Sequence, residues 1–143
     1  MPHVDGRSPA QVYAFVIGGA LVIAGIVGFF YSASFGAPGK VHDVFGVLGV
    51  NAWHNLVHIA TGAIGLVSLG YAAARTYSLA LGVVYVAIAV WGFIIGDGHS
   101  ILGFIPVNTD DNVLHVIIGV TGLGAYAATP AAPAPTTAPS RST

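Results

Sequence analysis

The chain has 143 residues, of which 55% are apolar and only 6% are charged, and its formal net charge is −1. A soluble domain carries roughly 25% charged residues, so this composition argues against a globule that is exposed to water. Four scattered cations form no basic patch, which excludes nucleic acid as a partner. There is no cysteine, so disulfides, thiolate catalysis and Cys-ligated metal sites are excluded as well.

Four long apolar runs predict transmembrane helices. In chain order they cover about residues 12–31, 51–71, 76–96 and 111–128. About 20 apolar residues are needed to cross a hydrocarbon core of about 30 Å, and only the last run is short by this measure. The runs are continuous and do not alternate, which favours helices over barrel strands. The sequence therefore predicts an all-α integral membrane protein with one transmembrane domain over residues 1–128.

The few charges predict the orientation of this domain. Arg7, Arg75 and Arg141 fall on one side of the four predicted helices, whereas Lys40 and four Asp residues fall on the other. Because Lys and Arg favour the cytoplasmic side, we expect a multi-pass protein of the bacterial cytoplasmic (inner) membrane with both termini in the cytoplasm. The tail, residues 129–143, is rich in Pro, Ala and Thr and is expected to be disordered.

The sequence repeats itself at an offset of 57 residues. NLVHIATGAIGL at 55–66 returns as NVLHVIIGVTGL at 112–123, and nine of 25 positions are identical between 42–66 and 99–123. Upstream, Gly18 and Gly28 match Gly82 and Gly92 at an offset of 64. Each repeat contains two helices, so both copies begin on the same side of the membrane. This pattern predicts a tandem parallel repeat of a helical hairpin, with a pseudo-two-fold axis along the membrane normal.

Matched polar and small residues form one stripe on each of two helices. Their spacing of 4, 3, 4 and 3 places them on a single helix face. The stripes consist of Asn51, Asn55, His58, Gly62 and Gly65 in the first copy and of Asn108, Asn112, His115, Gly119 and Gly122 in the second. Glycine lets helix backbones approach closely in lipid. We therefore expect helices 51–71 and 111–128 to meet along this stripe at the pseudo-axis.

Histidines on the extracytoplasmic side are candidates for a metal site. Neutral imidazole binds zinc, copper and iron, and Asp can complete the ligand set. The candidate ligands are His58, His115, His54, His42, His99 and Asp111. The side chains that could orient the imidazoles are Asn55, Asn112, Asn51 and Asn108. A b-type haem between His58 and His115 is disfavoured, because the glycines would bring these two helices too close for a porphyrin.

Three functions remain open at this point. The first is a structural or accessory protein of a larger membrane assembly, in which the imidazoles and amides bond each other. The second is a protein that binds a transition-metal ion. The third is a small transporter or channel, which would require oligomers because the polar groups gather at one end. No catalytic residue is predicted, since there is no Glu and no recognisable nucleophile motif. The expected partners are the lipid bilayer and either further copies of the chain or other membrane-complex subunits.

The phrase N-x-x-x-N-x-x-H-[IV]-x-x-G-x-x-G-L occurs once in each hairpin. Together with the four predicted helices and the Pro/Ala-rich tail, it resembles an actinobacterial membrane-protein family that is catalogued as a domain of unknown function. The resemblance covers about residues 10–128. It implies a four-helix inner-membrane protein of a high-GC Gram-positive bacterium. It implies no activity and no functional residues.

Overall fold

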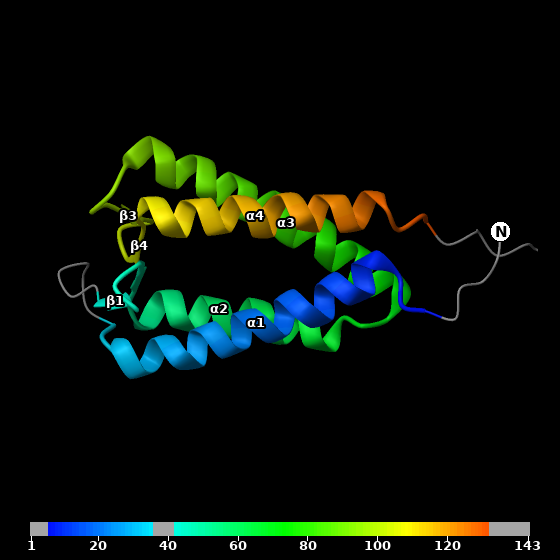
Figure 1. Ribbon diagram of the computed structural model, residues 1–143, viewed down its shortest axis with the longest axis horizontal. Coiled ribbons are helices and arrows are strands. Elements are labelled where there is room, and N and C mark those ends of the chain that lie inside the picture. The colour runs from blue at the N-terminus through cyan, green and yellow to red at the C-terminus, as the bar shows by residue number, and fades with distance from the viewer. Residues whose placement is uncertain (1–5, 36–41, 132–143) are drawn as a thin grey trace, which may run out of the picture.

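The computed structural model describes residues 6–35 and 42–131, which form four helices and two small β-hairpins. The helices are α1 (Pro9–Tyr31), α2 (Ala52–Val67), α3 (Tyr71–Ile95) and α4 (Thr109–Ala127). The strands are β1 (His42–Val44), β2 (Leu48–Val50), β3 (Ser100–Ile101) and β4 (Ile105–Pro106). The helices run along the long axis of the molecule, and both β-hairpins lie at the end opposite the start of α1 (Figure 1). The prediction of a mainly helical protein with four helices is confirmed.

Two of the helices, α1 and α3, are long and apolar enough to cross a membrane by length and composition. Helix α2 has only 16 residues and ends at Val67, earlier than the sequence predicted. Helix α4 carries Asp110 and Asp111 in its first turn. The structure therefore identifies two candidate membrane spans, each packed against a shorter or more polar helix.

Helix α1 begins earlier than predicted because its first turn is capped. The Ser8 hydroxyl accepts a hydrogen bond from the Gln11 backbone N–H at 3.3 Å, and the Gln11 side chain accepts one from the Ser8 N–H at 2.9 Å. Pro9 occupies the first helical position, where its missing N–H leaves no hydrogen bond unmade. The Gln11 amide also donates to the carbonyl of Leu69 at 2.8 Å. The start of α1 is thereby tied to the loop between α2 and α3.

Helix α3 begins at Tyr71 and includes Arg75, which the predicted span excluded. Arg75 Nε donates to the carbonyl of Thr129 at 2.7 Å, and its guanidinium lies 4.0 Å from the centre of the Tyr126 ring. The charge is thus satisfied by the end of α4. Thr129 itself is buried, and its hydroxyl accepts from the Ala10 N–H at 3.0 Å. The packed region therefore extends past the predicted start of the tail, and residues 132–143 lie outside the described part.

In each glycine stripe one glycine packs within its own hairpin and the other contacts the opposite hairpin: Gly62 and Gly119 meet the preceding helix, whereas Gly65 meets Tyr77 and Gly122 meets Tyr13. A Cβ atom added to Gly62 would lie 2.5 Å from the carbonyl oxygen of Gly18 on α1, and one added to Gly119 would lie 3.0 Å from that of Gly82 on α3. Within the described residues, α2 and α4 do not pack against each other along their length. The expectation that the stripes join α2 to α4 was therefore wrong. The spacing identifies the small-residue face, but the preceding helix offers glycines of its own and is the neighbour that Gly62 and Gly119 contact.

The two helical hairpins meet through tyrosines near the end at which α1 starts. The Tyr13 hydroxyl donates to the carbonyl of Ile118 on α4 at 2.8 Å, and the Tyr77 hydroxyl donates to that of Thr61 on α2 at 3.2 Å. The buried apolar core gathers around these tyrosines, and its members are Ala10, Tyr13, Ala14, Leu21, Ala74, Tyr77, Leu81, Tyr85 and Ile118. Contact between the hairpins is thus tightest away from the β-hairpins.

The segments before α2 and α4, which lie outside the four predicted helices, contain antiparallel strands. Val44 pairs with Leu48 in the first, and Ile101 pairs with Ile105 in the second. The turns place a bulky residue and a glycine at positive φ: Phe45 at 53° with Gly46 at 74°, and Leu102 at 54° with Gly103 at 78°. Such turns suit tight hairpins, but Asn-Gly or Asp-Gly is their usual sequence signal. Phe-Gly and Leu-Gly lack that signal.

Candidate metal centre

Three histidines come together between α2 and α4, close to the β-hairpins. One ring nitrogen from each of His54, His58 and His115 lies within 4.8 Å of the other two. His54 and His58 are one turn apart on α2, with ring centres 4.3 Å apart, and the His115 ring on α4 lies 6.1 Å and 6.3 Å from them. His54 is 3% exposed and His115 is 5% exposed. The structure therefore gathers three of the six predicted ligands into one cluster.

The ring of His54 is oriented by the backbone around it. Asn51 caps α2, and its side-chain oxygen accepts from the His54 N–H at 2.9 Å. The Nδ1 atom of His54 lies 3.0 Å from the carbonyl oxygen of Gly49 in β2. A carbonyl can only accept, so Nδ1 carries the proton and Nε2 presents a lone pair. Metal-binding histidines typically use one ring N–H in this way.

The nitrogen of His54 that presents the lone pair faces His58. The two Nε2 atoms are 3.1 Å apart. This distance fits a hydrogen bond from His58 to His54. It also fits two ligands of one ion, because tetrahedral zinc with Zn–N of about 2.0–2.1 Å separates its nitrogen ligands by about 3.3–3.4 Å. The His54–His58 pair is therefore already close to the geometry of a shared ion.

His115 contributes a nitrogen that lacks a partner. Its Nδ1 atom is buried and makes no hydrogen bond to any described residue. The ring of Tyr85 stands nearly perpendicular to the His115 ring, with centres 5.2 Å apart, and holds it from the other side. Leaving a buried polar atom unpaired costs roughly 1–3 kcal/mol, so such an atom calls for a physical reason. A bound ion or water beside the cluster would provide one.

Asp111 lies outside the cluster but is linked to it through one peptide unit. Its Oδ2 atom accepts from the Gly49 N–H at 3.0 Å, and the Gly49 carbonyl in turn accepts from His54. Asn108 caps α4 and accepts from the Asp111 N–H at 2.8 Å. Asp111 is therefore placed to position His54 rather than to bind an ion beside it. The role of Gly49 was not predicted from the sequence. A signal was present, because the matched residue of the second copy, Pro106, has no N–H and cannot donate the corresponding hydrogen bond.

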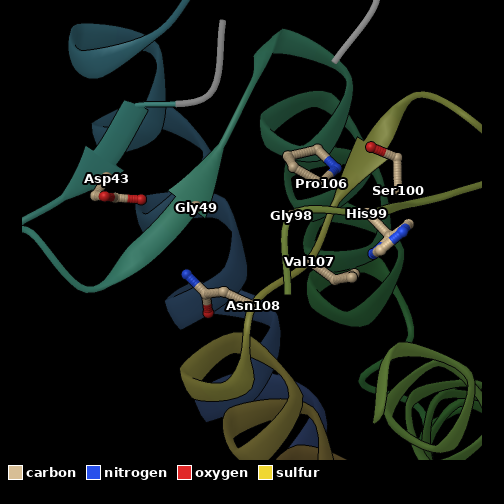
Figure 2. Close-up of a pocket in the computed structure, with 8 residues that line it drawn as sticks. All are labelled: Asp43, Gly49, Gly98, His99, Ser100, Pro106, Val107 and Asn108. Atoms are coloured by element: carbon tan, nitrogen blue, oxygen red, sulfur yellow. The ribbon is translucent and has the colours of Figure 1, made fainter. Parts of the chain in front are cut away.

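The remaining predicted ligands do not join the cluster. His99 is exposed and lines an outer pocket of about 180 Å³ between the two β-hairpins. Figure 2 shows His99 on one side of this pocket and Asp43 on the other. Gly49 also lines this pocket, and its carbonyl contacts His54, so a single peptide unit separates the outer pocket from His54. The backbone of His42 pairs with Val50 in the first β-hairpin, and its side chain lies outside the described part.

The four asparagines fall into two kinds of position. Asn51 and Asn108 cap α2 and α4, and each side-chain amide also crosses to the opposite β-hairpin, to the carbonyls of Phe104 at 2.5 Å and Val47 at 2.8 Å. Asn55 instead packs on α1, where its amide donates to the carbonyl of Ser32 at 2.9 Å. Asn112 lies against Gly92 of α3, but its side-chain amide makes no hydrogen bond to a described residue. The structure thus gives Asn55 and Asn112 a place in helix packing, away from the imidazoles that they were expected to orient.

These features define a small helical protein with two candidate membrane spans and a cluster of three histidines. The chain belongs to the family described as Domain of unknown function (DUF4383), whose model matches residues 11–128. This match confirms the family expected from the repeated N-x-x-x-N-x-x-H phrase. Neither the curated proteins nor the solved structures contain a match to the chain.

Proposed function

We propose that the protein crosses the membrane four times and binds one transition-metal ion through His54, His58 and His115. Large apolar side chains on the outside of α1 and α3 support the membrane location, with Ile23 63% exposed and Ile94 78% exposed. Helices α2 and α4 run beside these spans and extend for about 24 Å and about 28 Å, close to the thickness of a hydrocarbon core.

Matched contacts support the tandem repeat and its pseudo-two-fold axis. The Tyr13–Ile118 and Tyr77–Thr61 hydrogen bonds join residues at equivalent positions of the two copies. The crossing bonds of Asn51 and Asn108 are equivalent in the same way. His58 and His115 are also matched, so the axis would pass between them and through the cluster. Arg7 precedes the start of α1 and Arg75 lies near the start of α3, and both helices start at the same end of the molecule (Figure 1), which favours a cytoplasmic location for both termini.

The observation that carries the metal proposal is the convergence of three ring nitrogens within 4.8 Å. Three neutral imidazoles with a fourth position open suit Zn²⁺ or a copper ion. If the cluster were only a structural clamp, His54 and His58 would satisfy each other and Nδ1 of His115 would stay unpaired. The geometry therefore favours metal binding over the structural role that the sequence alone favoured, and a place in a larger assembly is compatible with either.

A b-type haem fits this cluster poorly, but not for the reason expected from the sequence, which was that the glycines would hold α2 and α4 too close together. The glycines do not draw α2 and α4 together, so they leave the space between these helices undetermined. A porphyrin held by His58 and His115 would have to pass between their ring nitrogens. The ring of His54 lies beside that space, with its Nε2 atom only 3.1 Å from that of His58. An ion without a macrocycle is the better occupant.

The direct test is elemental analysis of protein purified in mild detergent without chelator and then exposed to Zn²⁺, Co²⁺ or Cu²⁺. We expect one ion per chain, lost in the double variant His58→Ala/His115→Ala. His99→Ala is the matched control, because His99 lies in the outer pocket, and it should keep the ion. Wild-type protein that remains folded and binds no ion would overturn the proposal.

A further inference from the structure

The histidine cluster lines a groove of about 580 Å³ together with Val44, Phe45, Leu48 and Val50 of the first β-hairpin. Aliphatic residues of α1 between Ile17 and Val27 form one wall, and Leu114, Ile117 and Ile118 of α4 form the other. The polar residues that line the groove are the three clustered histidines and Asp111, and the other lining residues are apolar. The rims face outward, since Ile23 is 63% exposed and Ile117 is 54% exposed. In the proposed membrane location, the groove would open toward lipid.

The matched position in the second copy holds a much smaller cavity. This cavity, of about 60 Å³, lies between α2 and α3 on the other side of the same histidines. Three residues of α1 are smaller than their counterparts on α3, and the pairs are Ala20 with Val84, Leu21 with Tyr85, and Ala24 with Ile88. The facing helix offsets part of the larger volume on α3, because α2 has Thr61 at the position where α4 has the larger Ile118. The groove thus exists on one side because α1 carries small residues there.

The size and lining of the groove select a class of ligand. Sites for small molecules are usually about 300–1,000 Å³, mostly apolar, with a few polar groups in fixed places. Apolar walls with one polar patch fit a molecule that has an apolar body and a single polar head. Three neutral imidazoles would leave the +2 charge of an ion unbalanced, and Asp111, which already accepts from Gly49, would offset at most one of these charges. An anionic oxygen donor is therefore favoured as the head.

We infer that the groove binds a fatty carboxylate from the membrane and brings its head group to the open position of the metal. This inference rests on the proposed three-histidine metal site. The unpaired Nδ1 of His115, a residue that is 5% exposed and lines the groove, marks the place where the head group would lie. The acyl chain would lie along α1, beside Ala20 and Ala24.

The test uses Co²⁺-loaded protein in a non-ionic detergent, because the visible absorption of cobalt changes with its ligands. The number of cobalt ions per chain is measured first, and the protein is then titrated with decanoate or with acetate. We expect decanoate to change the spectrum at a concentration at least tenfold lower than acetate. If acetate is as effective as decanoate, or if cobalt-loaded protein responds to neither, the groove inference is overturned while the metal site stands. If no cobalt binds, the proposed function itself has failed.

A groove-filled variant provides the second arm. Ala20→Val/Ala24→Ile copies the side chains of the second copy at two exposed positions that line the groove and leaves the buried Leu21 unchanged, so it should fold. We expect it to bind cobalt as the wild type does and to lose at least tenfold in sensitivity to decanoate. Ile26→Phe is the matched control, because Ile26 is an exposed residue of α1 that does not line the groove. An undiminished decanoate response in the groove-filled variant would overturn the inference.

Discussion

Replacing Gly62 with Ala perturbs the contact that holds α2 against α1. The added Cβ would lie 2.5 Å from the carbonyl oxygen of Gly18 and 2.8 Å from the backbone nitrogen of Val22. Both atoms belong to the α1 backbone, which cannot rotate away as a flexible side chain could. The two helices must therefore separate locally, and the contacts along the rest of the interface weaken as they do.

The size of this effect follows from two opposing terms. Overpacking of a close contact typically costs about 1–3 kcal/mol. Alanine recovers roughly 0.5–1 kcal/mol, because glycine is unfavourable inside a helix. We expect Gly62→Ala to lower the free energy of unfolding by about 1–2 kcal/mol. Gly19→Ala is the control, since a Cβ there meets no described atom within 4 Å, and it should be neutral or slightly stabilising.

The assay is reversible unfolding in mixed micelles, followed by far-ultraviolet circular dichroism for the wild type and both variants. The comparison between variants matters more than any absolute value, because the detergent background is common to all three. If Gly62→Ala proved as stable as Gly19→Ala, Gly62 could not be in backbone contact with α1. The close packing of α2 on α1 at Gly62 would then be refuted.

Three further predictions follow from the same structure. Tyr13→Phe and Tyr77→Phe should each destabilise the protein by about 0.6 kcal/mol, measured by the same unfolding assay, and clearly unequal losses would contradict the equivalence of the two hairpins. Asp111→Ala should weaken metal affinity roughly 10–100-fold in a chelator-competition titration, while one ion per chain still binds. Asp111→Asn should restore part of the affinity, and an unchanged affinity in Asp111→Ala would show that Asp111 does not position His54. Metal affinity should stay nearly constant from neutral pH to about 5 and fall only in more acid solution, because burial of His54 and His115 disfavours the protonated imidazoles that compete with the ion. A steep loss of affinity already between neutral pH and about 6 would argue against these buried ligands.

Much of the architecture can be predicted from the sequence because apolar runs report directly on helices. The spacing of His54 and His58 places both on one face of α2, and the repeat points to His115 as the partner of His58. These three residues form the cluster that the structure contains. Periodicity and self-similarity point to these three residues, but they did not exclude His42, His99 and Asp111, which the sequence also proposed as ligands.

The features that the sequence did not predict depend on which helices and strands become neighbours in the fold. A glycine stripe specifies a face, and the sequence alone did not show that Gly62 would meet α1. The link from Asp111 through Gly49 to His54 requires a β-hairpin whose turn places Phe45 at positive φ, and this turn lacks a familiar sequence signal. Tertiary pairing, rather than local preference, determines both features.

The measurement that tests the central claim most directly is the X-ray absorption fine structure of zinc bound to the wild-type protein in detergent. The account predicts three imidazole nitrogens and one further light atom at about 2.0–2.1 Å, with His58→Ala reducing the imidazole count by one. A spectrum dominated by oxygen ligands without the imidazole scattering pattern would contradict it. So would a three-imidazole spectrum that is unchanged in the His58→Ala variant, because the ion would then be bound elsewhere.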